Sequence, residues 1–145
     1  MKIFSLTCTR AGELSNTTTD LLEYFKRCNI QSKLLVDKSS IFTAYDEGLD
    51  ELQADHDDII ILCHDDIRIL TDPTVFTTIL KEKLTKPDTG FVGVAGTTIL
   101  SNSGIWWDQE FWQKGKHSGC VIHGLDLVNP DDTYFGKLGQ VSVLD

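Results

Sequence analysis

Two adjacent acidic residues, Asp65 and Asp66, directly follow an apolar run that has the length of a β-strand. Two carboxylates held side by side repel each other, so a cation or a positive partner is needed to stabilise the pair. Mg²⁺ and Mn²⁺ bind one or two carboxylates together with phosphate oxygens of a substrate. The pair therefore predicts a divalent-metal site, and the alternative is that both residues are solvated turn residues.

The elements that must position this pair are short β-like runs alternating with amphipathic helical patterns. This alternation is typical of a parallel sheet flanked by helices, and the fold class is therefore α/β. Helix starts are indicated at Asn16, at Ser40 and at Asp72 followed by Pro73. The expected strands are Lys2–Thr7, Gln31–Val36, Asp58–Cys63 and Phe91–Gly96.

Two of these elements carry further expectations about burial. The run Asp58–Cys63 is continuously apolar after its first residue, which is typical of a central parallel strand covered on both faces. The helix that starts at Asp72 has apolar residues at helical spacing, which predicts one buried face. That face consists of Val75, Phe76, Ile79, Leu80 and Leu84.

Ligands of open α/β sheets bind at the carboxyl ends of the strands, so the residues just after each strand are the candidates for chemistry. Acidic residues occur at two of the four strand ends, after the second and the third strand. The candidates are Thr7, Thr9 and Arg10 after the first strand, Asp37 and Lys38 after the second, His64, Asp65 and Asp66 after the third, and Gly96 and Thr97 after the fourth.

The composition limits the class of protein and of partner. A chain of 145 residues is long enough for one ordinary domain. Its 13 basic and 22 acidic residues give a formal charge of -9, which repels nucleic acids and anionic membrane surfaces. An acidic protein that binds an anionic ligand usually needs a bridging cation, and this again favours a metal site.

The cysteines and the apolar segments indicate a cytoplasmic protein. Cys8, Cys28, Cys63 and Cys120 are scattered without metal-ligand spacing, and the first three are expected to be small hydrophobic residues of the core. No signal-peptide pattern follows the start of the sequence, and no apolar run approaches the roughly 20 residues of a membrane span.

Several short motifs in a fixed order resemble one enzyme family. Five segments follow one another along the chain: the motif Tyr45–Leu49, the strand Ile59–Cys63, the motif His64–Ile67, the run Phe91–Gly96 and the pair Trp106-Trp107. Together they resemble the family 2 type of GT-A glycosyltransferases, and within it a bacterial and viral glycosyltransferase-like subfamily. The resemblance implies a GT-A, Rossmann-like sandwich with a mostly parallel central sheet flanked by helices.

This resemblance implies a single domain over residues 1–145, with two parts. Residues 1–100 would be the nucleotide-binding half, and residues 101–145 a shortened part that binds the acceptor and completes the metal site. The second part is expected to be irregular, because Gly and polar residues multiply there and only short β-like pieces remain. These pieces are Cys120–His123 and Val141–Leu144.

The resemblance also implies roles for the residues at the strand ends. The first strand end would contact the base of a nucleotide-sugar donor, most simply a UDP-sugar, and the acidic residue after the second strand would accept a hydrogen bond from that base. Asp65 would contact the ribose, and Asp66 would bind Mn²⁺ or Mg²⁺. The residues concerned are Thr7, Thr9, Arg10 and Asp37 for the base, and Lys38 either for phosphate or as a solvated turn residue.

The later part of the chain supplies further candidates. The candidates for contact with the sugar or the acceptor are Trp106, Trp107 and Gly96. Aromatic rings such as those of the two tryptophans cover the apolar faces of sugars. The alternative for the tryptophans is a small satellite core. His117 or His123 would complete the metal site in some relatives, but a histidine on a β-like run is otherwise packed or exposed.

The catalytic base is the main departure from the family pattern. In the inverting relatives it lies on a helix beyond a further strand, whereas this sequence ends at Val141–Asp145. Substitutes would be Asp108, Glu110, Asp126 or Asp145, and nothing in the sequence ranks them. A second copy of the chain could also complete the site, which would make the protein a homo-oligomer.

Three functions are therefore compared. The favoured one is a metal-dependent glycosyltransferase, with inversion as the usual outcome, that moves a sugar from a nucleotide-sugar to a carbohydrate or other hydroxyl acceptor. The alternative is a non-catalytic module that binds a sugar nucleotide or a carbohydrate. A reading of His64-Asp65 as part of an HD phosphohydrolase is disfavoured, because that fold is helical and His64 follows a β-like run.

Overall fold

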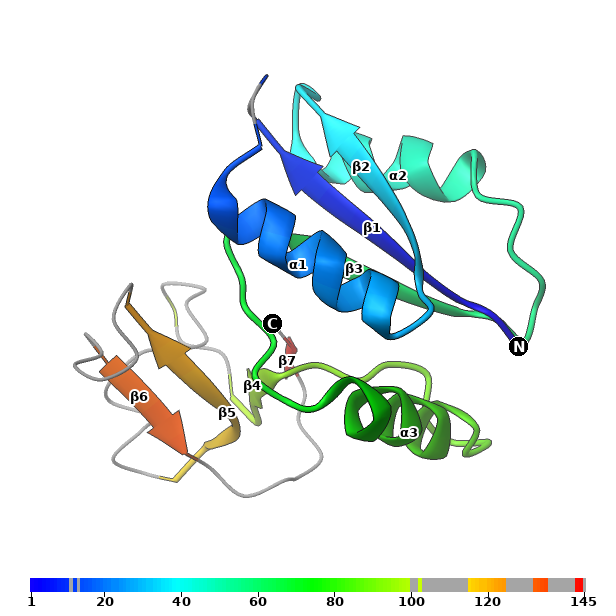
Figure 1. Cartoon of the computed structure of the whole chain (residues 1–145). Helices are drawn as coiled ribbons and strands as arrows, with labels where there is room; N and C mark the ends of the chain where they lie inside the picture. Colours follow the sequence, from blue (N-terminus) through cyan, green and yellow to red (C-terminus); the bar gives the residue numbers. More distant parts are fainter. Residues whose placement is uncertain are drawn as a thin grey trace. The chain divides into compact units, whose positions relative to one another are not determined.

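A computed structural model describes residues 1–10, 12, 14–99, 102, 115–124, 132–135 and 143–144. The chain divides into two compact units, Met1–Asp88 and Thr89–Asp145. The first unit contains the helices that Figure 1 labels α1 to α3 and the strands β1 to β3. Strands β4 to β7 belong to the second unit.

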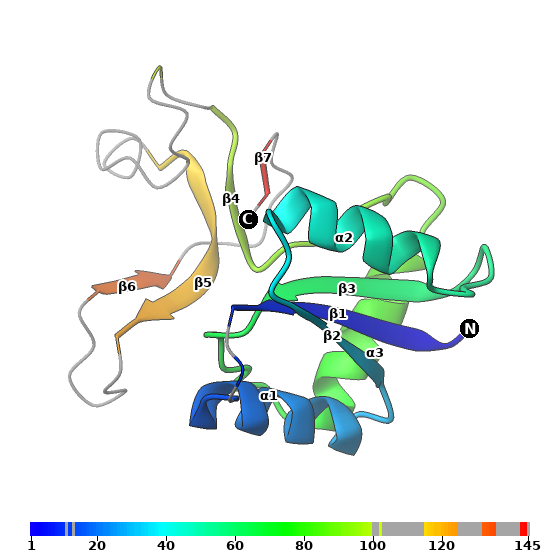
Figure 2. The same ribbon diagram turned by 90° about the horizontal axis from the view of Figure 1, so that it is seen from above.

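The first unit is a parallel three-stranded sheet with helices on both faces. The strand order is β2-β1-β3, and both neighbours run parallel to β1. Figure 2 shows α2 above the sheet and α1 and α3 below it. The α/β fold predicted from the alternating pattern is therefore confirmed. The elements are β1 (Ile3–Thr9), α1 (Asn16–Arg27), β2 (Gln31–Val36), α2 (Ile41–Asp50), β3 (Ile59–His64) and α3 (Pro73–Leu84).

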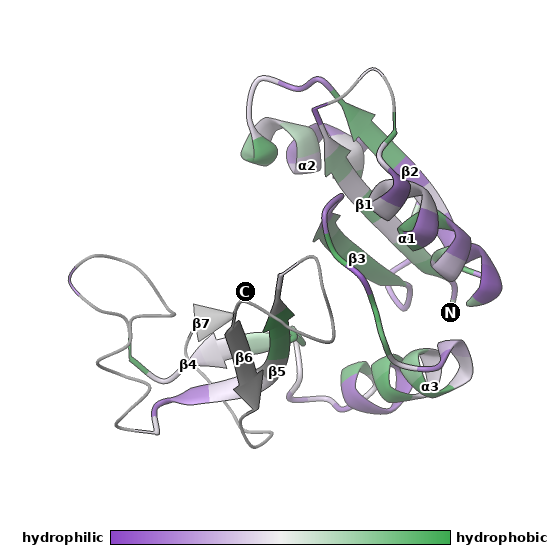
Figure 3. Cartoon of the chain, turned by 60° about the vertical axis from the view of Figure 1, so that its left-hand side comes forward, coloured by the Kyte–Doolittle hydropathy of each residue, from purple (hydrophilic) through white to green (hydrophobic). Residues whose placement is uncertain are grey.

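Two apolar clusters hold the layers together, one on each face of the sheet. The larger cluster joins β1 and β3 to α1, and residues of α3 such as Phe76 pack against it. Phe25 of α1 is completely buried there. Leu6, Leu35 and Ala44 form the smaller cluster beneath α2. Figure 3 shows hydrophobic residues along the strands and residues of both kinds along α1, as expected for helices with one buried face.

Gly48 sets how closely α2 approaches the sheet. A Cβ atom at this position would lie 3.0 Å from Leu35 Cδ1 and 3.2 Å from Leu6 Cδ1. These distances are shorter than an ordinary van der Waals contact, so the missing side chain lets the helix pack directly on the strands. The close contact brings the first turns of α2 near the carboxyl ends of β1 and β2.

Side-chain caps fix where the three helices begin. Ser15 Oγ accepts a hydrogen bond from Thr18 N at the start of α1, so the cap is Ser15 and the predicted cap at Asn16 is wrong by one residue. Ser40 caps α2 in the same way, and Asp72 caps α3 with Pro73 at the first helical position, both as predicted. Such caps satisfy N–H groups that have no partner within the helix.

Two predictions about burial are wrong in the part of the chain that the structure describes. β3 is at the edge of the sheet, and only alternate residues such as Ile59 and Cys63 are buried. Leu62, on the other face, is 49% exposed. α3 has no fully buried residue, because Val75 and Ile79 are exposed and only Phe76, Leu80 and Leu84 pack against the core. A continuous apolar run cannot by itself distinguish a central strand from an edge strand.

The second unit is an antiparallel sheet with the strand order β6-β5-β4-β7. The fourth strand was expected at Phe91–Gly96, but it begins only at Ala95, and Phe91 is 85% exposed. Gly119 lies at φ +126 in this sheet, where a Cβ atom would come within 2.4 Å of Val94 O. The strands are β4 (Ala95–Thr97), β5 (His117–His123), β6 (Asp132–Phe135) and β7 (Val143–Leu144).

A membrane-spanning helix is not found among the residues that the structure describes, since none of their helices is both long and apolar enough. The three cysteines that can be described, Cys8, Cys28 and Cys63, are free thiols and are half-buried or buried. This agrees with the expectation that they act as small core residues.

Candidate functional site

The carboxyl ends of the three parallel strands meet at one edge of the sheet in the first unit. Cys8 is paired with His64 on β3, and Thr9 is paired with Val36 on β2. The residues that follow, Arg10, Asp37 and Asp65, therefore leave the sheet at the same edge. Because neighbouring strands are about 5 Å apart, the ends of β2 and β3 are separated by roughly 10 Å.

The N-terminus of α1 is tied to the end of β3. The buried Thr18 donates a hydrogen bond from Oγ1 to the main-chain oxygen of Asp65 at 3.3 Å. Its own amide donates to Ser15 Oγ at 3.0 Å, and the two hydroxyl groups are 2.8 Å apart. The start of a helix carries a partial positive charge, which favours anions beside it. The first turn of α1 is thus fixed next to the acidic pair.

Asp65 and Asp66 differ in exposure. Asp65 is half-buried, whereas Asp66 and His64 are exposed in the turn that follows β3. In residues 1–10, 12, 14–99 and the shorter described segments, no group of three His, Cys, Asp or Glu side chains could hold a metal ion. Two carboxylates offer the oxygen ligands that Mg²⁺ and Mn²⁺ take, and these ions commonly keep the remaining positions for water and substrate phosphates. The pair therefore fits a metal site that a phosphate ligand would share.

Asp37 has an unusual backbone conformation at the end of β2. Its φ angle is +50°, which is uncommon for a residue with a side chain, and its amide donates to Thr9 O at 3.1 Å. Residues in such conformations are enriched at functional sites. The neighbouring Lys38 pairs instead with Glu47 of α2 at 2.5 Å, and this hydrogen bond and ion pair raise the pKa of Lys38.

Thr7 and Thr9 lie at this edge, but their side chains are buried. Thr7 Oγ1 is 3.2 Å from Cys63 Sγ and forms a hydrogen bond with it. A ligand at the end of β1 would therefore meet main-chain groups, Cys8 and the exposed Arg10 more readily than either threonine side chain.

Cys8 and Tyr45 were not predicted as part of the site. Both are half-buried, and the Tyr45 hydroxyl forms a hydrogen bond with the Cys8 thiol. Burial raises the pKa of the Cys8 thiol and that of Tyr45, and the charge of Asp65 raises that of Cys8 further. Burial also raises the pKa of Cys63 to about 11. These thiols are thus neutral at pH 7. In the sequence, Tyr45 belongs to the motif Tyr45–Leu49, and nothing there indicated its contact with Cys8.

The remaining candidates belong to the second unit or lie outside the described residues. Gly96 is buried in β4, and the half-buried His117 is paired with Thr97 across the β4–β5 ladder. His123 is paired with Asp132 at the other end of β5. The candidates outside the described residues are Trp106, Trp107, Asp108, Glu110, Asp126 and Asp145.

Comparison with known proteins gives a family that agrees with this arrangement. The family described as "Glycosyltransferase like family" matches residues 13–141, which is most of the chain. The chain belongs to this family. The resemblance to family 2 GT-A glycosyltransferases is thereby confirmed, and membership implies a sugar donor and an acceptor. No curated protein and no solved structure gives a significant match.

Proposed function

We propose that this glycosyltransferase-family protein moves a sugar from a nucleotide-sugar, a UDP-sugar in particular, to an acceptor hydroxyl with the help of Mn²⁺ or Mg²⁺. The observation that carries the proposal is the convergence at one sheet edge of Arg10, Asp37, the acidic pair Asp65-Asp66 and the N-terminus of α1. This edge is where open α/β sheets bind nucleotides.

The base and the ribose of the donor would lie across the ends of the three strands. Uracil offers an N–H donor that matches the carboxylate of Asp37, and Arg10 is an exposed cation beside it. The half-buried Asp65, roughly 10 Å away at the end of β3, would accept a hydrogen bond from a ribose hydroxyl. A nucleoside can bridge this separation.

The diphosphate would lie at the metal-binding end of this surface. Asp66, with Asp65 beside it, would hold the divalent cation by carboxylate oxygens. When bound, the cation would neutralise the diphosphate leaving group. A chain with a formal charge of -9 otherwise repels such a ligand, so binding of the donor should require the cation.

Transfer to the acceptor requires one proton to move. The acceptor oxygen attacks the anomeric carbon and forms a new carbon–oxygen bond, while the bond from that carbon to the diphosphate oxygen breaks. The hydroxyl proton passes to a carboxylate, which acts as the general base. The predicted candidates for that base are Asp108, Glu110, Asp126 and Asp145. Inversion at the anomeric carbon is the outcome expected from the family resemblance.

Nucleotide release measures this function directly. UDP-, GDP-, CMP- and dTDP-sugars would each be incubated with the protein, Mn²⁺ and a panel of mono- and oligosaccharide acceptors. We expect metal-dependent release from a UDP-sugar that increases with acceptor and is lost in Asp66→Asn. Saturable binding of every donor without turnover would contradict the proposal and would favour a binding module.

A further inference from the structure

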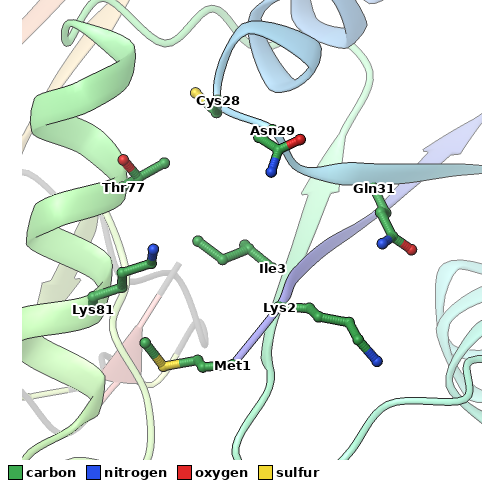
Figure 4. A pocket seen from close by; sticks show the side chains of 8 residues that line it. All are labelled: Met1, Lys2, Ile3, Cys28, Asn29, Gln31, Thr77 and Lys81. Atoms are coloured by element: carbon green, nitrogen blue, oxygen red, sulfur yellow. The ribbon is translucent and has the colours of Figure 1, made fainter.

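A small cavity lies at the amino-terminal edge of the sheet in the first unit, at the opposite end of the strands from Asp65 and Asp66. Its volume is about 260 Å³, and it lies between the start of β1, the end of α1, the start of β2 and one face of α3. Figure 4 shows Lys81 and Thr77 of α3 on one side of the cavity, Cys28 and Asn29 at the end of α1 on the other, and Ile3 of β1 next to Lys81. Since β1 has seven residues, the two ends are roughly 20 Å apart.

The polar side chains around this cavity are hydrogen-bond donors or cations, and none is a carboxylate. Lys81 has no hydrogen-bond or ion-pair partner for its ammonium group among the described residues. Asn29 adds a side-chain amide at the end of α1. The polar ends of Gln31 and Lys2 point away from Lys81 in Figure 4, and the Lys2 ammonium group is 3.5 Å from Asp55. The Thr77 hydroxyl already donates to carbonyl groups of its own helix, so it shapes the cavity and supplies no donor.

The end of α1 does not cancel this positive character. The last carbonyl groups of a helix normally carry partial negative charge. Here the amides of Cys28, Asn29 and Ile30 donate to the carbonyl oxygens of Tyr24, Lys26 and Phe25 at 2.9–3.1 Å. Asn29 has a φ angle of +56°, the left-handed conformation with which helices commonly end. Three of the last carbonyl groups of α1 are therefore already hydrogen-bonded.

From these features we propose that the cavity binds a small oxyanion, a phosphate group in particular. Its volume is below the range of pockets for larger ligands, so it suits a group of a few atoms. A phosphate accepts several hydrogen bonds at once and pairs strongly with an ammonium group. The buried Ile3 beside Lys81 gives the cavity an apolar wall. The formal charge of the chain is -9, but the lining of this cavity contains no carboxylate that would repel an anion.

An NMR titration at constant ionic strength tests this site. Inorganic phosphate and a nucleoside monophosphate would be added separately to the wild-type protein, to Lys81→Gln and to Lys86→Gln. Lys86 is also an exposed lysine, lies outside the cavity and loses the same charge. The signals to follow are the side-chain amide of Asn29 and the methyl groups of Ile3.

We expect these signals to shift with a dissociation constant in the millimolar range. Lys81→Gln should weaken binding about tenfold, as for loss of a charged hydrogen bond, while Lys86→Gln should leave it unchanged. Equal affinity for both ligands would mean that the cavity recognises the phosphate group alone. Tighter binding of the nucleoside monophosphate would mean that the bound phosphate group belongs to a nucleotide. Absence of shifts with either ligand, or equal weakening in both variants, would overturn the proposal.

This test is independent of the proposed transferase activity. Asp66→Asn lies at the other end of the strands and should leave the phosphate titration unchanged. Lys81→Gln should in turn leave binding of the nucleotide-sugar unchanged. Failure of one proposal therefore does not imply failure of the other.

Discussion

The two units of this chain are built by different means. In the first unit, Met1–Asp88, helices cover both faces of a parallel sheet, and both apolar clusters found among the described residues lie here. In the second, Thr89–Asp145, short strands pair in an antiparallel ladder, and the described residues of β5 are half-buried. Buried side chains join the layers of the first unit, and main-chain ladders and Gly119 are the features that the described residues of the second unit show.

This difference shows which parts of the chain tolerate substitution. Apolar burial contributes in proportion to the area removed from water, so large side chains dominate the stability of the first unit. In the ladder of the second unit, Gly119 has a φ angle of +126°, which residues with a side chain rarely adopt. Removal of a buried side chain should therefore lower the free energy of unfolding most in the first unit, and replacement of Gly119 should have the larger effect on the ladder of the second unit.

The largest effect is expected for Phe25→Ala in the first unit. Phe25 is completely buried between α1 and the sheet, and its removal should lower the free energy of unfolding by about 4 kcal/mol. The same change at Phe91 in the second unit, which is 85% exposed, should cost less than about 0.5 kcal/mol. Urea unfolding of both variants measures the difference, and equal costs would refute the contrast between the units.

The second unit should respond most strongly at Gly119. In Gly119→Ala the new Cβ would lie 2.4 Å from Val94 O, at a φ angle of +126°, and we expect a cost of about 3 kcal/mol. Gly115→Ala is the control, because it has open space at φ +62° and should cost about 1 kcal/mol. Amide exchange of the β4 and β5 residues reports the loss. Unchanged exchange in Gly119→Ala would show that the ladder does not need this glycine.

Alkaline pH should destabilise the first unit through Cys63. The unfolded thiol ionises near pH 9, whereas burial raises its pKa in the folded protein to about 11. The folded state therefore holds this proton more tightly, and its stabilising contribution is complete below pH 9 and is lost as the pH rises to 11. The loss should be about 2 kcal/mol. Urea unfolding over this pH range should give a flatter profile for Cys63→Ala, and parallel profiles would contradict the assignment.

The smallest effect is expected at the cap of α1. Ser15→Ala removes the acceptor for Thr18 N and should cost about 1 kcal/mol, with faster amide exchange at Thr18. Asn16→Ala, one residue further along, is the control and should cost less. If Asn16→Ala proved the more destabilising of the two, the cap would be the residue expected from the sequence and not Ser15.

The sequence predicted the regular first unit well because its signals are local. Ser40 and the Asp72-Pro73 start gave the beginnings of α2 and α3, and apolar periodicity located the strands. Pairing depends on distant residues, so the apolar run of β3 did not reveal that this strand is at the edge of the sheet. In the second unit, the apolar start of Phe91–Gly96 predicted a strand where only Ala95–Thr97 forms one.

The candidate site was predictable to a similar extent. Strand ends identified Arg10, Asp37 and the acidic pair, because topology alone brings the carboxyl ends of parallel strands together. The sequence did not show that Thr7 is buried against Cys63, or that Lys38 pairs with Glu47. Thr7 and Cys63 are 56 residues apart in the chain, and the Lys38–Glu47 pair depends on the conformation of the loop that joins β2 to α2.

Thermal unfolding with a UDP-sugar, in the presence and absence of Mn²⁺, tests the central claim that the acidic pair at the end of β3 holds a cation for the donor. Stabilisation should increase with ligand excess over its dissociation constant. It should require Mn²⁺, disappear in Asp66→Asn, and persist in Asp57→Asn, a matched change at a residue whose side chain is 90% exposed. Donor binding that is indifferent to both Mn²⁺ and Asp66 would contradict the account.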